Sequence, residues 1–480
     1  MKILLLEPAE GLRYSNFAIP QLGLAYLAAR LLEARHEVRV FHAALARDPR
    51  KELLAEVDAF QPEVVGFSAP TSKVMTAGDL AADIKQTAPH VKTIVGGWHV
   101  TALPRETLAS FPAFDFGFVG EAEDYILTLL GALQNGDGLE DVPGLVWRRD
   151  GEIAANPPGK PTDLQTLPRP AWHLFPMDRF APMYRAHGRD YPMMSGRGCP
   201  FRCSFCQRVT GAVVRTRDIN DVVDELFAGT ERWQADGVQF LDETFTVNAH
   251  RTNALCELLI ERGVPGRLIW NCTSRVDTIS REMLAVMKRA GCRVILLGME
   301  SGNQHVLEGV CKNTTLQQGL SAVRWCREIG LLTDVSFVLG LPRDNRHTVR
   351  ETVAFSRRLD PDFVSYFSFV PFPGTEGGRL AEEGRENLRL LHRDWSRYQP
   401  QLSPTCELLD FSARRLVALR YRAYLRFYLR PRKFFNLLAM FRPRSMLRVF
   451  ARLVGDLAGR GPRSERGKRY PNKFHFVRLR

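Results

Sequence analysis

Three cysteines lie within eight residues of one another, in the segment Cys199-Pro-Phe-Arg-Cys203-Ser-Phe-Cys206. Thiolates at this spacing can hold one soft metal centre on a tight loop. Zinc usually takes a fourth Cys or His ligand, and the nearest histidine, His187, lies upstream in a different segment. Three cysteines suit a [4Fe–4S] cluster whose fourth iron stays open to another ligand. We therefore predict an iron–sulfur cluster at these cysteines, with zinc as the minor alternative.

The other six cysteines are scattered along the chain: Cys256, Cys272, Cys292, Cys311, Cys326 and Cys406. An odd total of nine, in a long chain with no signal peptide, argues against a disulfide framework. We expect these six to be small residues of the hydrophobic core.

The cysteine segment, with the aromatic Phe205 directly before the last cysteine, resembles the cluster loop of the radical S-adenosylmethionine (SAM) superfamily. The resemblance implies that the open iron binds SAM. It also implies that an electron, from a donor of the flavodoxin or ferredoxin type, cleaves SAM to methionine and a 5′-deoxyadenosyl radical. The motif identifies these cofactors and leaves the substrate open.

Polar or turn residues follow successive predicted strands downstream of this loop, in the order found in radical SAM enzymes. The resemblance assigns the first group to the SAM amino group, the Ser/Arg pair to its carboxylate, and the last three to its ribose and adenine. Alternatives are an ordinary helix N-cap for the first group and a surface salt bridge for the arginine. The positions are Asp242, Glu243, Thr244, Ser274, Arg275, Glu300, Ser301 and Leu339.

The elements that must position these residues alternate between strands and helices. Over residues 191–380, strands near 193–195, 237–241, 268–272, 293–298, 333–340 and 363–370 predict a partial (βα)6 TIM-like barrel, with functional residues at the strand C-termini. Residues 136–190 hold eight prolines and read as a connector with at most one hairpin, at Asp150-Gly151. Residues 381–480 read as a mainly helical, basic extension.

Residues 1–135 predict a doubly wound, Rossmann-like parallel sheet, with strands near 2–6, 38–41, 64–68, 93–96 and 116–119. Helices are expected at 21–34, 51–60, 74–88 and 122–134. Ligands of such sheets bind beyond the carboxyl ends of the strands. The fold class predicted for the whole chain is therefore α/β.

An α/β domain ahead of a radical SAM barrel resembles the cobalamin (B12)-binding members of the superfamily. The segments that carry the resemblance include Gly96-Gly97-Trp98-His99 and Gly120-Glu121. The Asp-x-His-x-x-Gly signature of an axial histidine is absent, which implies base-off cobalamin without a histidine ligand. The subgroup often has Asp where this chain has His42. A flavodoxin-like domain kept for packing, or for another ligand, is the alternative. The expected cobalamin-lining residues are Ser68, Thr71, Gly96, Gly97, His99 and Glu121.

The resemblance implies a cobalamin-dependent radical SAM methyltransferase acting on an unactivated carbon, or less often phosphorus, of a small-molecule or lipid-like substrate. An enzyme with the same cofactors that cyclises or rearranges its substrate, as the Mg-protoporphyrin ester cyclase does, is the first alternative. A cobalamin-binding sensor or scaffold that cleaves no SAM is the second.

The formal net charge of +13 is unevenly distributed along the chain. Residues 411–480 hold 20 Lys and Arg against Asp456 and Glu465, whereas the first 410 residues hold 46 basic and 51 acidic residues, so nucleic acid is not an expected partner. Basic amphipathic helices are predicted at 417–428, ending before Pro431, and at 446–457. They read as a cap on the barrel or as a peripheral membrane contact. No apolar run approaches 20 residues, so we expect a cytoplasmic protein, associated with a membrane if these helices bind one.

Overall fold

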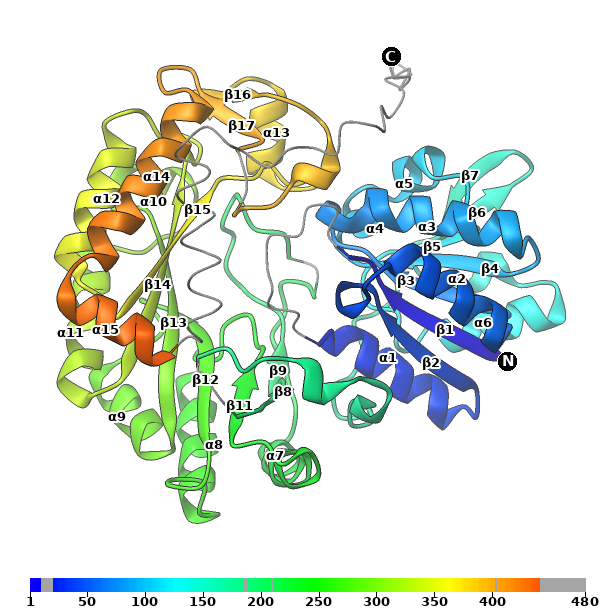
Figure 1. The fold of residues 1–480 in the computed structure, drawn as a ribbon, viewed down its shortest axis with the longest axis horizontal. Coiled ribbons are helices and arrows are strands. Elements are labelled where there is room, and N and C mark those ends of the chain that lie inside the picture. The colour runs from blue at the N-terminus through cyan, green and yellow to red at the C-terminus, as the bar shows by residue number, and fades with distance from the viewer. Residues whose placement is uncertain (10–19, 185–187, 209, 402–403, 441–480) are drawn as a thin grey trace.

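The structure is a computed structural model that describes residues 1–9, 20–184, 188–208, 210–401 and 404–440. The N-terminal part forms a seven-stranded sheet in the order β2-β1-β3-β4-β5-β6-β7. Its five strands β1 to β5 are parallel to one another. It lies beside the barrel, in blue in Figure 1. Its strands are β1 (Lys2–Glu7), β2 (Glu37–His42), β3 (Val64–Ser68), β4 (Lys92–Gly96), β5 (Phe116–Phe118), β6 (Leu145–Arg149) and β7 (Glu152–Ala155). Its helices are α1 (Leu22–Glu33), α2 (Pro49–Phe60), α3 (Val74–Thr87), α4 (Trp98–Ala102), α5 (Pro104–Ser110) and α6 (Ile126–Asn135).

Both faces of this sheet are covered, as expected when helices connect parallel strands. In β1, Ile3 and Leu5 belong to one buried cluster, whereas Leu4 and Leu6 belong to another on the opposite face. The strand order reverses between β1 and β3, and this switch point is where ligands of doubly wound sheets bind. The predicted parallel sheet is thus confirmed.

The hairpin expected at Asp150-Gly151 joins β6 to β7, and both residues have positive φ, 49° and 84°. Two positive φ values are the requirement of a type I′ turn. Because β6 pairs antiparallel with β5, the N-terminal sheet continues past residue 135 as far as Ala155.

The second sheet has six parallel strands in the order β15-β14-β13-β12-β11-β8, which is the predicted partial barrel. Side chains of Asp218, Ser280 and Thr315 cap α7, α9 and α11 by accepting hydrogen bonds from backbone N–H groups of the first turn. The strands are β8 (Asp190–Met193), β11 (Gly237–Phe240), β12 (Ile269–Arg275), β13 (Cys292–Glu300), β14 (Leu332–Leu339) and β15 (Phe363–Ser368). The helices are α7 (Ile219–Trp233), α8 (Ala249–Glu261), α9 (Arg281–Arg289), α10 (Gln304–Gly309), α11 (Leu316–Ile329) and α12 (Thr348–Leu359).

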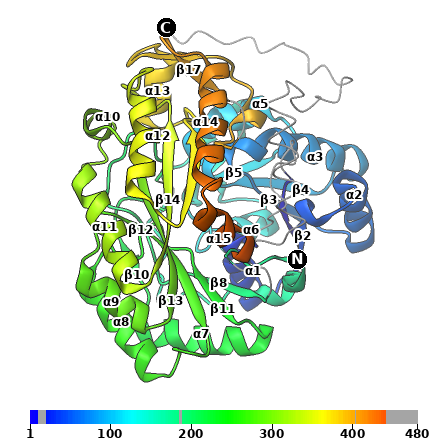
Figure 2. The same ribbon diagram turned by 60° about the vertical axis from the view of Figure 1, so that its left-hand side comes forward.

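The segment after the barrel comprises α13 (Glu376–Glu382), β16 (Leu388–Leu390), β17 (Cys406–Leu408), α14 (Ala413–Tyr428) and α15 (Pro431–Met440). Helix α14 lies along the edge strand β15 (Figure 2). The Tyr424 hydroxyl donates to the Tyr366 carbonyl at 3.2 Å and accepts from its N–H at 2.8 Å. The Tyr428 hydroxyl does the same for Val364, at 3.1 and 3.0 Å. These hydroxyls satisfy backbone groups that an edge strand leaves unpaired, so α14 is a cap on the barrel.

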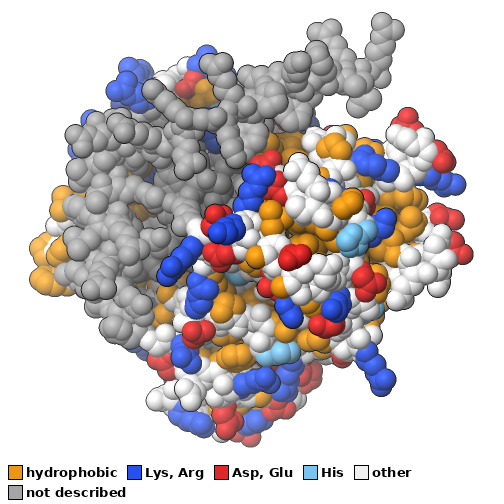
Figure 3. Space-filling model, turned by 45° about the vertical axis from the view of Figure 1, so that its right-hand side comes forward, with side chains coloured by type: hydrophobic (Ala, Val, Ile, Leu, Met, Phe, Trp, Pro, Cys, Tyr) orange, Lys and Arg blue, Asp and Glu red, His pale blue; other side chains and the backbone are white. Residues whose placement is uncertain are grey.

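Five of the six scattered cysteines are buried, as predicted, but Cys311 is exposed, so that prediction is wrong for this residue. It follows α10 in a surface turn and has a φ of 53°. The amphipathic helix predicted at 446–457 lies outside the described residues. Within the described part of the chain, no helix is both long and apolar enough to span a bilayer. On the face shown in Figure 3, acidic and basic side chains are interspersed.

Candidate active site at the cluster loop

The three predicted cluster ligands lie on a loop of residues 198–214, the cluster loop, between two short paired strands. These strands are β9 (Gly196–Arg197) and β10 (Arg215–Thr216), in which Arg215 faces Arg197. Within the loop the Cys199 N–H donates to the Gly211 carbonyl at 3.2 Å, and the Ser204 N–H donates to the Val310 carbonyl at 2.9 Å. The loop is therefore held at its ends and also against the turn after α10.

The thiols of the cluster loop lie close enough to influence one another. Burial raises the pKa of Cys206 to about 12, and the neighbouring Cys203 and Cys199 thiols add to this rise, although part of its surface faces solvent. Within the described residues, no three Cys, His, Asp or Glu side chains are gathered as ligands of a single metal ion. The three thiolates of a [4Fe–4S] cluster bind three different irons, so such a cluster does not require three ligands around a single ion.

Two positive charges lie beside these thiols. Arg275, at the end of β12, donates from Nη1 to Cys203 Sγ at 3.4 Å and stacks over the Phe201 ring at 3.6 Å. Its Nη2 also donates to Asp277 at 2.8 Å and to the Lys312 carbonyl at 2.6 Å. The Lys312 ammonium is buried and pairs with Glu300 at 2.9 Å. Burial raises the pKa of Cys203, while Lys312 and Arg275 oppose the rise. Such charges suit a cluster held by thiolates, which is negatively charged overall.

The group predicted to bind the SAM amino group lies directly against the cluster loop. Both carboxylate oxygens of Asp242 accept from Ser195, from its N–H and its hydroxyl, at 2.7 Å each. Burial raises the pKa of Asp242 to about 6, although the Ser195 bonds oppose this. Glu243 accepts from the Gly198 N–H at 3.1 Å and from the Thr210 hydroxyl, and the Thr244 hydroxyl lies 3.8 Å from Cys199 Sγ. The three residues line a cleft of about 320 Å3, open mouth included.

The roles of Asp242, Glu243 and Thr244 toward SAM stay predictions. The roles of the other residues that the resemblance assigns to SAM stay predictions as well. Ser274 is buried and bonds to the Thr246 hydroxyl, and Ser301 is buried with its hydroxyl 3.2 Å from that of Thr352. Leu339 is fully buried at the end of β14, and Phe205 is half-buried in the cluster loop. Glu300 faces Lys312, as described above, and has a φ of 66°.

The predicted cobalamin residues of β3 and β4 gather at the carboxyl edge of the N-terminal sheet. Ser68 and Gly96 end neighbouring strands in register, and Thr71 follows in the helical turn η2 (Thr71–Lys73). The Thr71 hydroxyl is buried without a hydrogen-bond partner among the described residues. At Gly97, φ is 104° and a Cβ would press on the Ala69 backbone, which explains the glycine. This edge carries an unsatisfied hydroxyl and two glycines at the end of β4, which fits a large polar ligand.

His99 lies in α4, two residues after Gly97. Its ring is fully buried and meets the Trp395 ring edge-on at a centroid distance of 4.3 Å, and burial lowers its pKa to about 3. Neither ring nitrogen has a hydrogen-bond partner in the described structure. His42, at the end of β2, pairs with Glu7 at 2.5 Å, and Glu7 also pairs with Lys73.

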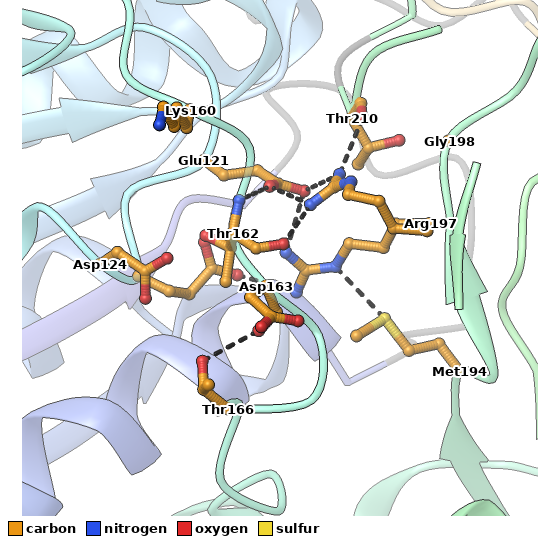
Figure 4. A network of polar contacts seen from close by, with 12 residues as sticks. Glu121, Asp124, Lys160, Thr162, Asp163, Thr166, Met194, Arg197, Gly198 and Thr210 are labelled. Carbon is orange, nitrogen blue, oxygen red and sulfur yellow. Dashed lines mark hydrogen bonds and ion pairs between the residues drawn. The ribbon is translucent and has the colours of Figure 1, made fainter. Parts of the chain in front are cut away.

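Glu121 follows β5 and lies at the contact with the barrel (Figure 4). Its carboxylate forms ion pairs with Arg215 at 2.8 Å and with Arg197 at 3.1 Å. The structure thus engages Glu121 with the strands that flank the cluster loop, and its cobalamin contact stays a prediction. Sequence reasoning missed Lys312, Arg197 and Arg215, because charged residues in loops carry no periodic signal.

Comparison with known proteins agrees with this arrangement. Residues 12–130 match the B12 binding domain family, and residues 193–356 match the radical SAM superfamily. The chain is 33% identical over 441 residues to an uncharacterized methyltransferase of Pyrococcus horikoshii, covering 90% of this chain and 93% of that protein. It is 28% identical over 362 residues to the anaerobic magnesium-protoporphyrin IX monomethyl ester cyclase of Rubrivivax gelatinosus, covering 74% of this chain and 65% of that protein.

The fold is similar to that of the radical SAM methyltransferase TsrM from Kitasatospora setae, solved with cobalamin and a [4Fe–4S] cluster bound. The TM-score is 0.70 at 20% identity, over 85% of this chain and 87% of that one. This chain belongs to the cobalamin-binding family of radical SAM enzymes.

Proposed function

We propose that this enzyme is a methyltransferase that transfers a methyl group to an unactivated carbon, or to phosphorus, of a small-molecule or lipid-like substrate. The observation that carries the proposal is the presence in one chain of a three-cysteine loop beside a polar cleft and of a second ligand edge on the N-terminal sheet. The relative covered over 93% of its length is named a methyltransferase. The cyclase relative supports the alternative of the same cofactors without methyl transfer.

When bound, the cluster supplies the electron that cleaves SAM to a radical, and cobalamin carries the methyl group. The residues of this chain prepare the site for that chemistry. Arg275 and Lys312 offset the negative charge of the thiolates, since charge near a cluster sets its potential. Asp242 fixes Ser195, and Glu243 fixes Gly198, so both sides of the cleft are held in place. Arg275, Lys312 and Asp242 are themselves buried.

The decisive measurement quantifies two SAM products from the anaerobically reconstituted enzyme with a candidate substrate. A methyltransferase must yield S-adenosylhomocysteine together with 5′-deoxyadenosine, whereas a cyclase or mutase yields only the second. A Cys203→Ala variant serves as the control and is expected to yield neither. A wild-type enzyme that forms 5′-deoxyadenosine and product without S-adenosylhomocysteine would overturn the methyltransferase assignment.

We also propose that cobalamin binds base-off and without an axial histidine. In support, His99 is covered by Trp395, and the chain carries no Asp-x-His-x-x-Gly signature. The cob(II)alamin-loaded enzyme should therefore show an electron paramagnetic resonance (EPR) spectrum without nitrogen superhyperfine splitting, unchanged in a His99→Ala variant. Splitting that disappears in His99→Ala would identify this histidine as a ligand instead.

A further proposal concerns surroundings and partners. All nine cysteines are free thiols, which suits a reducing compartment such as the cytoplasm, where a flavodoxin- or ferredoxin-type donor would supply electrons. Peripheral membrane contact is assigned to the basic residues beyond α14, since α14 itself is packed on the barrel. Flotation with anionic liposomes tests this contact by comparing the full chain with a chain ending at residue 431. Equal non-binding by both would exclude it.

A further inference from the structure

One carboxylate of the N-terminal domain holds both ends of the cluster loop. Glu121 follows β5 and reaches the barrel through both carboxylate oxygens. Oε1 accepts from Arg215 Nη2 at 2.8 Å and from Arg197 Nη1 at 3.1 Å. Oε2 accepts from Arg215 Nη1 at 2.8 Å and from the Thr162 N–H at 2.9 Å (Figure 4). With four donors on two oxygens, this carboxylate is saturated.

The two arginines stand on either side of the cluster loop. Arg197 lies in β9, two residues before Cys199, and Arg215 lies in β10, nine residues after Cys206. They face each other across the antiparallel pair. Arg197 also pairs with Glu123 at 2.8 Å, and Arg215 donates to the Thr210 carbonyl inside the loop at 2.9 Å. A displacement of Glu121 would therefore be transmitted to both ends of the loop.

These contacts are buried and directional. The side chains of Glu121 and Arg197 are each 9% exposed. Burial by itself would raise the pKa of Glu121, but the Arg215 hydrogen bonds and the Arg197 and Arg215 charges lower it overall. A buried, bidentate Arg–carboxylate pair adds little net stability after desolvation, yet its fork geometry fixes orientation strongly.

The cluster loop itself has little freedom to compensate for a displacement of Glu121. At its first residue, Gly198, φ is 98° and a Cβ would overlap the Val213 backbone. The backbone is therefore tightly packed at this position. Glu243 of the barrel holds the same residue from the other side, by accepting from the Gly198 N–H at 3.1 Å. The cluster loop is thus fastened by Glu243 of the barrel and, through its flanking arginines, by Glu121 and Glu123 of the N-terminal domain.

We propose that Glu121 is a positioning residue that couples the cluster loop to the N-terminal domain and thereby sets the distance and orientation between the cluster and cobalamin sites. The inference rests on the family's two cofactors, and its catalytic readout also rests on the proposed methyl transfer. Both cofactors must act on one substrate, and a misplacement of about 1 Å can cost about 10²-fold in rate. SAM cleavage needs the cluster site alone, whereas methyl transfer needs both sites. Loss of the coupling should therefore lower methyl transfer more than SAM cleavage.

The test uses the full-length enzyme carrying cluster and cob(II)alamin, with Glu121→Gln as the first variant. Removal of one partner of a buried ion pair leaves the other charge uncompensated and destabilises the fold. A Glu121→Gln/Arg215→Gln double variant, which leaves no unpaired charge at Arg215, therefore serves as the second. Asp115→Asn is the matched control, because it removes an acid that pairs with Lys85 within the N-terminal domain. Thermal unfolding and iron content confirm that each protein is folded and loaded.

The first readout is the dipolar coupling between the reduced cluster and cob(II)alamin in pulsed EPR, which needs no substrate and no turnover. We expect a broadened distance distribution in both Glu121 variants and an unchanged one in Asp115→Asn. The second readout is the ratio of methylated product to 5′-deoxyadenosine, expected to fall about tenfold or more in the Glu121 variants.

An unchanged distance distribution in folded, loaded Glu121 variants would overturn the proposal. Folded variants that no longer retain the cluster would also overturn it, because they would assign Glu121 to cluster retention. If the wild type makes no methylated product, the proposed function fails, but the dipolar coupling still decides the role of Glu121.

Discussion

Lys312 brings a buried ammonium to the neighbourhood of the cluster thiols. It pairs with Glu300 at 2.9 Å, and its backbone carbonyl accepts from Arg275, which itself donates to Cys203. A positive charge near a cluster stabilises the reduced, more negative state. We expect Lys312→Met to lower the cluster midpoint potential by tens of millivolts and Lys312→Arg to keep it near the wild-type value. Potentiometric titration followed by EPR measures both, and Lys51→Met on the exposed face of α2 is the control. An unshifted potential in Lys312→Met would contradict this electrostatic role.

Asp344 shows how one buried acid shapes a turn beside the predicted adenine contact. Its Oδ2 accepts from the N–H groups of Gly340 and Leu341, at 3.0 Å each, and its Oδ1 accepts from the Thr348 hydroxyl at 2.6 Å. Burial raises the pKa of Asp344 from 3.8 to about 7, although these bonds oppose the rise. The folded state therefore binds more protons than the unfolded state between about pH 4 and pH 7.

The free energy of unfolding should consequently contain a component that falls as pH rises through this window. Asp344→Asn keeps an oxygen for the two N–H groups and an amide that can donate to Thr348, so the turn should survive. We expect the variant to lose this pH-dependent component. Urea unfolding of the apoprotein from pH 4.5 to 8 measures it, with the exposed Asp58→Asn as control. Parallel pH profiles for wild type and Asp344→Asn would refute the assignment.

At the scale of elements, α14 stabilises the barrel by completing the edge of β15. The Tyr424 and Tyr428 hydroxyls each serve both backbone groups of one strand residue, while Phe427 is fully buried beneath them. The basic side chains Arg415, Arg422 and Arg426 lie on the exposed side of the helix. Such a helix closes an edge that would otherwise be open to other chains.

Removal of these hydroxyls should therefore expose unsatisfied backbone. We expect Tyr424→Phe and Tyr428→Phe each to lower the free energy of unfolding by about 1–3 kcal/mol. Tyr125→Phe, whose hydroxyl donates to the Lys160 carbonyl at the surface, should cost much less. Chemical denaturation measures the three variants. Equal small losses in all of them would show that the edge contacts add no stability.

At the scale of the whole molecule, the segment after the barrel reaches back to the N-terminal domain. Trp395 begins the helical turn η6 (Trp395–Arg397), which packs against η2 and α3. Its ring contacts His99 and, at a centroid distance of 6.1 Å, Phe111. The Trp395 contact and the Glu121 ion pairs thus join the N-terminal domain to the rest of the chain at two separate places.

Truncation of this ring should loosen the domain contact. Trp→Ala changes at packed sites cost about 3–5 kcal/mol, so we expect Trp395→Ala to speed amide hydrogen exchange in residues 98–111 and in η2 while the barrel strands stay protected. Trp233→Ala on α7, a half-buried ring of the barrel alone, is the control. Unchanged exchange at residues 98–111 would show that the tryptophan does not hold the domains together.

Local sequence was enough for the fold class and for the succession of strands and helices along the chain, and it is the basis on which the cluster ligands are predicted. Strand and helix periods depend on burial of side chains two or about four positions apart, so they can be read from one segment at a time. The cysteine spacing is likewise local, because all three ligands lie on one loop. The hairpin at Asp150-Gly151 was predictable for the same reason, since its turn needs two residues of positive φ.

The partners of charged residues were decided by tertiary structure alone. Glu121 pairs with arginines 76 and 94 positions away in sequence, and no local pattern predicts either pairing. The sequence around Lys312 does not predict that this residue lies beside cysteines more than a hundred residues earlier. Cys311, expected in the core, turned out exposed, because a turn rather than a helix face carries it. An ion pair needs only two groups brought together by the fold, and no sequence period records which two they are.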